Sequence, residues 1–279
     1  MPGYTGNGAQ AHVNDSGVES FTSRNGAWRI RTRKLPILKA EPIEAMNERL
    51  GIPIPEMIFG DNFVAIENIK TGWTLEFNAN DALDLVSKTA DGMLQVAYSE
   101  EWKRDRQHHH EGIKEVVKPF DWSYSTDYKG TTHTASAEDK SVWTPTDENT
   151  TPIRIDLLSR PEPILFYDEV MLYEDELADN GIAMLSCKIR VMAQRLLLLC
   201  RFFLRLDGVV IRLRDTRVYV ELDGSTVIRQ YTAKEESYDS MQAKLQAMRE
   251  NVPEAFRDPN KLSPLLKTVE SVMDKFDVR

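Results

Sequence analysis

Residues 196–221 alternate apolar and polar side chains on both sides of an Asp207-Gly208 pair. Alternation with a period of two is typical of a half-buried β-strand, and a two-residue Asp-Gly link is a strong hairpin signal. Because a turn fixes the register, this loop places three apolar pairs on one face: Leu206 with Val209, Leu204 with Ile211, and Phe202 with Leu213. The other face then pairs Arg205 with Val210, Phe203 with Arg212, and Arg201 with Arg214. Two arginines directly opposite each other require an acidic partner, from this chain or from another.

Similar patterns predict the elements around this hairpin. Residues 28–38, 57–69, 71–77, 164–173 and 186–192 are predicted to form strands. Helices are predicted for residues 42–50, ended by Gly51, and from residue 82 onward after a cap at Asn80 or Asp81. Two closing helices are predicted around residues 241–248 and across residues 263–276, where apolar residues recur at helical spacing. We therefore expect an α+β protein with a mainly antiparallel β-sheet core and a few peripheral helices.

The ends of the chain and one internal stretch differ from this pattern. Residues 1 to about 25 are rich in Gly, Ser, Asn and Thr, and we expect a disordered N-terminal tail there. Residues 26–279 are expected to form a single α+β domain. Residues 131–151 are rich in Thr, Ser, Glu and Asp, and are interpreted as a mobile loop within that domain.

Composition indicates a soluble globular protein, since apolar residues make up 41% of the chain and charged residues 28%. The longest apolar run, residues 196–200, is far shorter than the roughly 20 residues that span a membrane. The first residues lack the basic flank and apolar core of a signal peptide. Cys187 and Cys200 fall on inward strand positions and are interpreted as buried thiols of a reducing compartment. These features predict a cytoplasmic protein, with the nucleus as a second location.

Basic residues gather in the predicted strand core, although the whole chain has a formal net charge of −9. Residues 186–217 contain eight basic and two acidic residues, a net charge of +6, so the remainder carries −15. One interpretation is a solvated sheet face that is balanced by the acid-rich residues 168–179 on a neighbouring strand. The alternatives are a surface for an acidic or phosphorylated protein, or a nucleic-acid site built from Arg201, Arg205, Arg212 and Arg214.

The sequence contains little that indicates catalysis. It has no phosphate-binding glycine loop, nucleophile elbow or paired-cysteine metal motif. Three adjacent histidines, His108 to His110, cannot easily converge on one metal ion. The turn at Gly60, Asp61 and Asn62 resembles one in metal-dependent phosphatases, but the other ligands of such a site are missing from the expected context. We therefore predict no catalytic residue, metal or cofactor, and keep a divergent metal-dependent phosphatase as an alternative.

Three residues have two interpretations each. Asp81 is either a helix cap or a carboxylate presented to a partner at a strand-to-helix corner. Asp215 falls opposite Cys200 in the expected register, where a carboxylate must pair with a neighbour such as Arg217. Leu213 belongs either to the core or to an interface.

Six long segments together resemble the TIP41-like family of TOR signalling pathway regulators. The segments are PEMIFGDN (55–62), LEFNANDAL (75–83), EVVKPFDWSYSTDYKGT (115–131), FYDEVMLYEDELADNG (166–181), LSCKIRVM (185–192) and LLLLCRFFLRLDGVVIRLRDTR (196–217). The resemblance spans residues 28 to about 236 and leaves both ends of the chain uncovered. It implies a non-enzymatic regulator that binds the catalytic subunit of type 2A-like Ser/Thr protein phosphatases and modulates or inhibits it in TOR signalling. The Tap-forty-two/alpha-four protein is implied as a second partner.

The resemblance also implies which residues contact the phosphatase. Family binding residues correspond to Asp81 in its Asn-Ala-x-Asp-Ala-Leu motif, and to Leu213, Arg214 and Asp215 in the Ile-Arg-x-x-Asp-Thr-Arg strand. Leu213 stands where the family usually has Met, a change that conserves volume. Ile153 is the candidate for a further apolar contact. We expect a monomer that has neither nucleic acid nor a membrane as a partner, and we expect charge reversal at Asp81 or Asp215 to weaken binding without unfolding the chain.

Overall fold

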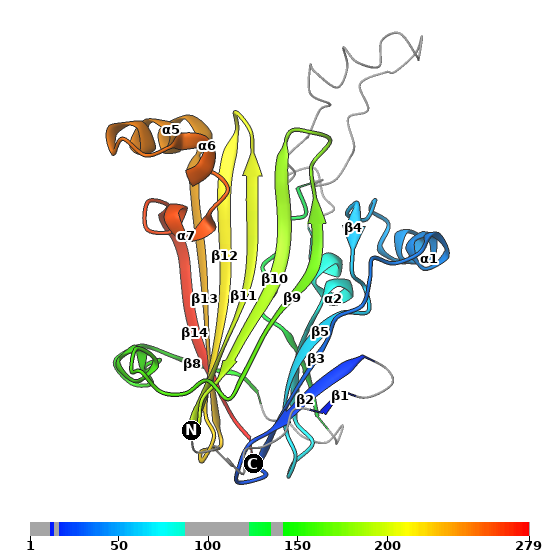
Figure 1. The fold of residues 1–279 in the computed structure, drawn as a ribbon, viewed down its shortest axis with the longest axis vertical. Coiled ribbons are helices and arrows are strands. Elements are labelled where there is room, and N and C mark those ends of the chain that lie inside the picture. Colours follow the sequence, from blue (N-terminus) through cyan, green and yellow to red (C-terminus); the bar gives the residue numbers. More distant parts are fainter. Residues whose placement is uncertain (1–11, 14–16, 87–122, 135–141, 279) are drawn as a thin grey trace, which may run out of the picture.

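The structure, a computed structural model, describes residues 12–13, 17–86, 123–134 and 142–278, and these residues form two antiparallel sheets (Figure 1). The smaller sheet has the order β1 (His12–Val13), β2 (Val18–Thr22), β3 (Trp28–Arg33), β5 (Phe63–Asn68), β6 (Thr74–Asn78) and β7 (Thr131–His133). The larger sheet has the order β4 (Met57–Ile58), β9 (Phe166–Asp175), β10 (Gly181–Val191), β11 (Arg195–Leu206), β12 (Val210–Glu221), β13 (Thr226–Ser237), β14 (Lys267–Asp277) and β8 (Thr144–Thr146). The expected α+β class with a mainly antiparallel core is confirmed.

Short helices accompany the two sheets, most of them at the margins (Figure 1). They are α1 (Ala40–Leu50), α2 (Ala79–Asp84), α4 (Ile155–Leu158), α5 (Tyr238–Ala247), α6 (Val252–Ala255) and α7 (Pro259–Leu262). The predicted helices at α1 and α5 are confirmed, and Gly51 ends α1 in the left-handed conformation. The cap of α2 differs from the prediction: Asn78, not Asn80 or Asp81, accepts the hydrogen bond from the backbone N–H of Asp81. None of the helices in the described residues is long and apolar enough to cross a membrane.

The register of the β11–β12 hairpin corrects the sequence prediction by one residue. Val210, not Val209, is the partner of Leu206, so the loop holds Asp207, Gly208 and Val209. Gly208 takes a φ of 71°, the left-handed position that three-residue hairpin loops reserve for glycine. A shift of one residue changes which side chains lie opposite each other, so the pairs become Arg201 with Asp215 and Phe203 with Leu213. The expected clash between Arg201 and Arg214 is therefore absent from the hairpin.

The predicted helix at residues 263–276 is wrong, because most of this segment forms β14. β14 pairs antiparallel with β13 and places Met273 and Phe276 on opposite faces of the sheet. Val269 and Val272, which the helical spacing assigned to a buried stripe, are exposed. Backbone pairing along most of β13 together with β-branched side chains outweighs the helical spacing of the apolar residues.

Two stretches expected to be disordered or mobile contain strands. In the predicted tail, β2 pairs with β3, and its Phe21 is buried against Phe166 with ring centroids 5.8 Å apart. In the predicted loop at residues 131–151, both ends pair with a sheet, as β7 beside β6 and as β8 beside β14. Aromatic contacts accompany two of these strands, of Phe21 with Phe166 and of Trp143 beside β8 with Trp73 and Phe276, and composition does not reveal them.

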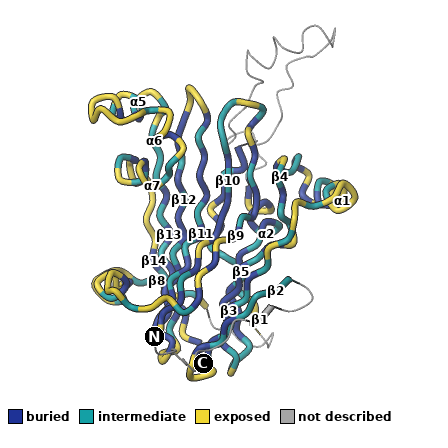
Figure 2. Tube along the Cα trace, in the orientation of Figure 1, coloured by how far each residue is buried: buried dark blue, intermediate teal, exposed yellow. Residues whose placement is uncertain are grey.

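The main core lies between the two sheets, and its side chains come from the facing strands (Figure 2). Cys187 and Cys200 are partners across β10 and β11, and both are buried free thiols as predicted. The outer face of the larger sheet carries two smaller clusters. One lies beneath α5, α6 and α7 and includes Phe203, Ile211 and Leu213. The other includes Ile153 and Tyr219 and lies beside α4.

Candidate functional site

Residues 123–131, the connecting segment, link the two sheets by hydrogen bonds. Toward the smaller sheet, Thr126 Oγ1 donates to the carbonyl of Ala82 at 3.0 Å, and Tyr128 Oη donates to the carbonyl of Glu76 at 3.0 Å. Toward the larger sheet, backbone carbonyls of the segment accept bonds from Tyr173 Oη, Thr216 Oγ1 and Arg229 Nη1, at 3.0–3.1 Å. The segment therefore fixes the position of α2 relative to β12 and β13.

Gly130 is the residue that allows this close approach. Its φ is 88°, and a Cβ at this position would lie 2.8 Å from the side chains of both Leu75 and Phe77. A side chain here would therefore be strained by the backbone and would also press on the floor of the smaller sheet.

Asp81 lies at the N-terminal end of α2 and is joined to the connecting segment. Its Oδ2 accepts a hydrogen bond from Thr131 Oγ1 at 2.5 Å and another from Asn78 Nδ2 at 3.0 Å. A carboxylate in the first turn of a helix is favoured by the helix dipole. The side chain is half-buried, so it has a structural role while part of it faces solvent. The predicted partner contact through Asp81 stays a prediction.

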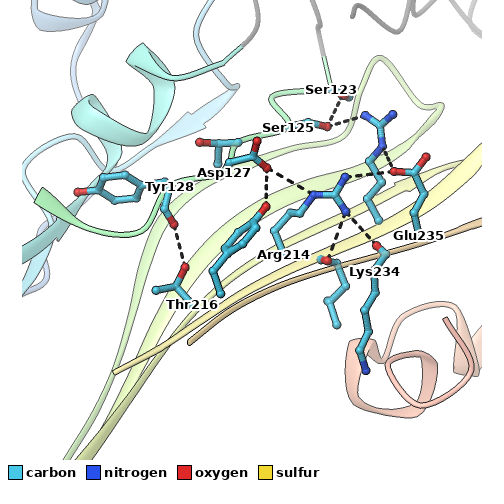
Figure 3. Close-up of polar contacts among 12 residues, drawn as sticks. Ser123, Ser125, Asp127, Tyr128, Arg214, Thr216, Lys234 and Glu235 are labelled. Carbon is cyan, nitrogen blue, oxygen red and sulfur yellow. Dashed lines mark hydrogen bonds and ion pairs between the residues drawn. The ribbon is translucent and has the colours of Figure 1, made fainter. Parts of the chain in front are cut away.

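Arg214 lies on the face of β12 that is turned toward the connecting segment, in a cluster of charged side chains (Figure 3). Its Nη2 is 3.1 Å from Glu235 Oε2, its Nη1 donates to the carbonyl of Lys234, and its Nε is 3.7 Å from Asp127 Oδ1. Asp127 also accepts from Tyr231 Oη at 2.5 Å. With 73% of its side chain exposed, Asp127 is the part of this cluster that a partner can contact.

Arg212 extends the same cluster along β12. Its Nε is 2.7 Å from Glu235 Oε2, and its Nη1 donates to Ser125 Oγ at 2.9 Å. Glu235 therefore bridges two arginines, while Ser125 and Asp127 bring the connecting segment to them. The connecting segment therefore joins Asp81, which bonds to Thr131, with Arg214, which pairs with Asp127. We call this assembly the bridging network; its side chains are Asp81, Ser125, Asp127, Thr131, Arg212, Arg214, Tyr231 and Glu235.

The other three predicted contact residues lie outside the bridging network. Asp215 is buried on the opposite face of β12, where both oxygens accept from Arg201 at 2.7 Å, rather than pairing with Arg217. Leu213 is 1% exposed beneath the C-terminal helices, and Ile153 is 6% exposed in the second outer cluster. Their burial favours the core interpretation of Leu213, and a partner contact through either apolar side chain stays a prediction.

Most of the basic residues in the hairpin region are paired within the chain. Carboxylate partners lie within ion-pair distance of Lys188, Arg195, Arg201, Arg205, Arg212 and Arg214. Of these, Lys188 is matched by Glu169 from the acid-rich strand, as expected, whereas the others use acids from elsewhere. Asp168 of that strand instead accepts from Thr32 and Lys34. The charges are therefore balanced within the chain, which argues against a free cationic site. The predicted solvated face is wrong, however, because the side chains of Arg195, Arg201, Arg212 and Arg214 are only 6–16% exposed. Arg201 pairs with Asp215 and so lies on the face of the sheet opposite Arg214.

The residues considered for catalysis are dispersed. Asp61 lies in a turn that follows β4, where Asn62 N donates to Phe59 O, and its exposed carboxylate is 3.9 Å from Arg33. His133 is exposed at the end of β7, and His108 to His110 lie outside the described residues. Within the described part of the chain, no group of three or more His, Cys, Asp or Glu side chains is placed to hold a metal ion.

Asp127, Tyr231, Thr131 and Glu235 belong to the bridging network, and sequence reasoning did not select them. Each comes from a different part of the chain than Asp81 or Arg214, and no periodic pattern relates them. The available signal is the run of hydroxyl and aromatic residues at 123–128. Of these residues, Tyr124 and Tyr128 are buried.

Alkaline pH is expected to destabilise the fold through buried tyrosines. Burial, followed by the charge of Glu221, raises the pKa of Tyr219 to about 12. Because an unfolded tyrosine titrates near pH 10, the contribution of Tyr219 is present below pH 10 and is lost as pH rises toward 12. Urea denaturation should show a free energy of unfolding that falls across this window, and Tyr219→Phe should reduce the slope. An unchanged slope in Tyr219→Phe would show that this phenol does not contribute.

Comparisons with known proteins agree with one another. A sequence model of the TIP41-like family matches residues 57–242, a span that contains the bridging network. The chain is 43% identical over 251 residues to the TIP41-like protein of Homo sapiens, covering 90% of this chain and 87% of that protein. It is 42% identical over 249 residues to "Type 2A phosphatase activator TIP41" of Saccharomyces cerevisiae, covering 84% and 68%. It is 34% identical over 214 residues to "Type 2A phosphatase activator tip41" of Schizosaccharomyces pombe, covering 77% and 81%.

Proposed function

We propose that this chain, which belongs to the TIP41-like family, is a regulator that binds the catalytic subunit of type 2A-like Ser/Thr protein phosphatases. The observation that carries this proposal is the 42% identity to the yeast protein named a type 2A phosphatase activator, over 84% of this chain. The fission yeast relative bears the same name. The two names indicate that the regulatory effect includes activation, so the proposal covers modulation in either direction.

The bridging network supports a binding role rather than a catalytic one. It brings together charged side chains of α2, the connecting segment, β12 and β13, with Asp127 exposed and Asp81 half-buried. Such an arrangement suits recognition of a protein surface, because charges fix orientation and speed association. We further propose that the protein acts as a monomer in the cytoplasm, within TOR signalling and together with the Tap-forty-two/alpha-four protein.

Charge reversal of Asp81 is expected to weaken binding to a purified type 2A-like catalytic subunit by about tenfold or more. The substitution Asp81→Lys places a cation where α2 presents a carboxylate, and it removes the acceptor for Thr131. Isothermal calorimetry measures the affinity, and the milder Asp81→Asn should give an intermediate value. A phosphopeptide hydrolysis assay on the same complex shows whether binding raises or lowers phosphatase activity.

The matched control is Glu148→Lys, which makes the same change in charge on the exposed turn after β8. It should bind with wild-type affinity, and the melting temperatures of all variants should be compared. If Asp81→Lys bound the phosphatase with the same affinity as the control, the proposed function would still hold, but Asp81 would not be part of the contact surface. Absence of binding by the wild-type chain would contradict the proposed function.

A further inference from the structure

A groove of about 460 Å³ opens on the larger sheet, away from the bridging network. Its floor is apolar, since Ile182 and Met184 are half-buried and Phe203 is buried. Ile182 and Met184 pack at the margin of the outer cluster that α5, α6 and α7 cover. The groove therefore continues an apolar surface that the C-terminal helices leave partly open.

Three carboxylates line one side of this groove. Glu174 lies on β9, while Glu176 and Asp179 lie in the turn between β9 and β10. Among the described residues, no cation lies within ion-pair distance of these three side chains. We call this feature, with its floor of Ile182, Met184 and Phe203, the acidic groove.

The rest of the lining does not neutralise the acidic groove. Arg205 is held by Asp207, with Nε and Oδ1 2.7 Å apart, which leaves Arg257 as the remaining cation of the lining. Four carboxylates and two guanidinium groups give the lining a net charge of −2. The same excess of negative charge affects Glu56. Burial raises the pKa of its carboxyl group, and the charges of Asp175, Glu176 and Asp179 raise it further.

The turn that carries the carboxylates is held firmly. Asp175 is buried, and its two oxygens accept from the backbone N–H groups of Leu177 and Glu56 at 2.7 and 2.9 Å. Leu177, Ala178 and Asp179 all take left-handed φ angles, between 52° and 63°, and Asn180 Nδ2 donates to the carbonyls of Leu177 and Ala178. A surface that is ordered before a ligand arrives loses less entropy on binding.

We propose that the acidic groove docks an extended segment of a partner protein in which a large apolar side chain is flanked by arginine or lysine. The apolar floor would bury the large side chain, and Glu174, Glu176 and Asp179 would pair with the flanking cations. The charge of the groove opposes nucleic acid, phosphorylated peptides and anionic membranes as occupants. This second docking surface is independent of the proposed function, because none of its residues belongs to the bridging network.

Fluorescence anisotropy with short synthetic peptides tests the proposal on the full chain. The probe is a labelled peptide of about nine residues with a central Phe-Leu pair and two arginines on each side. We expect it to bind the wild-type chain, and to bind the double variant Glu176→Lys and Asp179→Lys about tenfold or more weakly. A peptide with Ala-Ala at its centre, and one with glutamates in place of the arginines, should both lose about tenfold or more.

The control variant carries Glu148→Lys and Glu270→Lys, two exposed positions that are not part of the lining, and it changes the net charge by the same amount. It should bind the probe as the wild type does, and both variants should melt near the wild-type temperature. Equal weakening in the two double variants would show attraction to net charge alone and would overturn the proposal. Failure of the wild type to bind the probe, or equal binding of the glutamate peptide, would overturn it as well.

Discussion

Replacing Asp215 with alanine is expected to lower the free energy of unfolding by about 3–5 kcal/mol. Asp215 is 4% exposed, and its carboxylate makes two bonds of 2.7 Å to Arg201, whose side chain is 12% exposed. Truncation leaves the guanidinium buried without its counter-charge, although its bond to Asn260 remains. The expected cost is therefore dominated by the desolvated charge left behind. Urea denaturation followed by tryptophan fluorescence measures the change.

The pair Arg154 and Asp156 is a matched control for this experiment. It has the same two-bond geometry, with both distances at 2.9 Å, but both side chains are about half exposed. Asp156→Ala should therefore have a much smaller effect than Asp215→Ala. The double variant Arg201→Met with Asp215→Leu should recover much of the lost stability, because it removes both buried charges. Equal losses at the two sites would show that burial does not set the cost.

The burial of Asp215 also changes how the phosphatase interface can be tested. From the sequence, Asp215→Lys was expected to weaken binding without unfolding the chain. In the structure this substitution would place a second cation beside Arg201 in a buried position and would destabilise the fold. Weaker phosphatase binding by this variant could then result from unfolding as well as from a lost contact. Asp81→Lys avoids this difficulty, because Asp81 is half-buried and makes its hydrogen bonds with uncharged side chains.

Alternation predicted β9 to β12 of the larger sheet, whereas β14 was predicted as a helix and β8 as part of a loop. The error in the β11–β12 register has a local cause. The Asp-Gly signal located the β11–β12 turn, but Gly208 in a left-handed conformation fits a three-residue loop as well as a two-residue one. Nothing in the adjoining strands decides between the two, since Val209 and Val210 are both apolar. The outer cluster under the C-terminal helices settles the register, because it requires Phe203, Ile211 and Leu213 on one face.

The candidate site was less predictable, because its contacts join distant parts of the chain. The connecting segment bonds to β6 and α2 on one side, and to β12 and β13 on the other. Such contacts leave no period in the sequence, so Asp127 and Tyr231 could not be selected. Resemblance to a family pointed to Asp81 and Arg214, which the structure then placed at the two ends of one network.

Replacing Leu213 with alanine is expected to lower the free energy of unfolding by about 2–5 kcal/mol. Leu213 is 1% exposed opposite Phe203, in the cluster beneath α5, α6 and α7. The truncation opens a cavity where those helices pack on the sheet, so backbone amides of α5 should also exchange hydrogen faster. Urea denaturation and hydrogen exchange measure the two effects. If α5 loosens in this variant, a change in phosphatase binding can arise without any contact through Leu213 itself.

Val209→Ala distinguishes this register from the one expected from the sequence. A two-residue loop would place Val209 opposite Leu206 in the buried stripe, and its truncation would then cost about as much as other core deletions. In the structure Val209 belongs to the loop and is 49% exposed, so the substitution should change stability by about 0.5 kcal/mol or less. A large loss for Val209→Ala would contradict the register. Leu213→Ala does not separate the two registers, because Leu213 faces Phe202 in one and Phe203 in the other and belongs to a buried cluster in both.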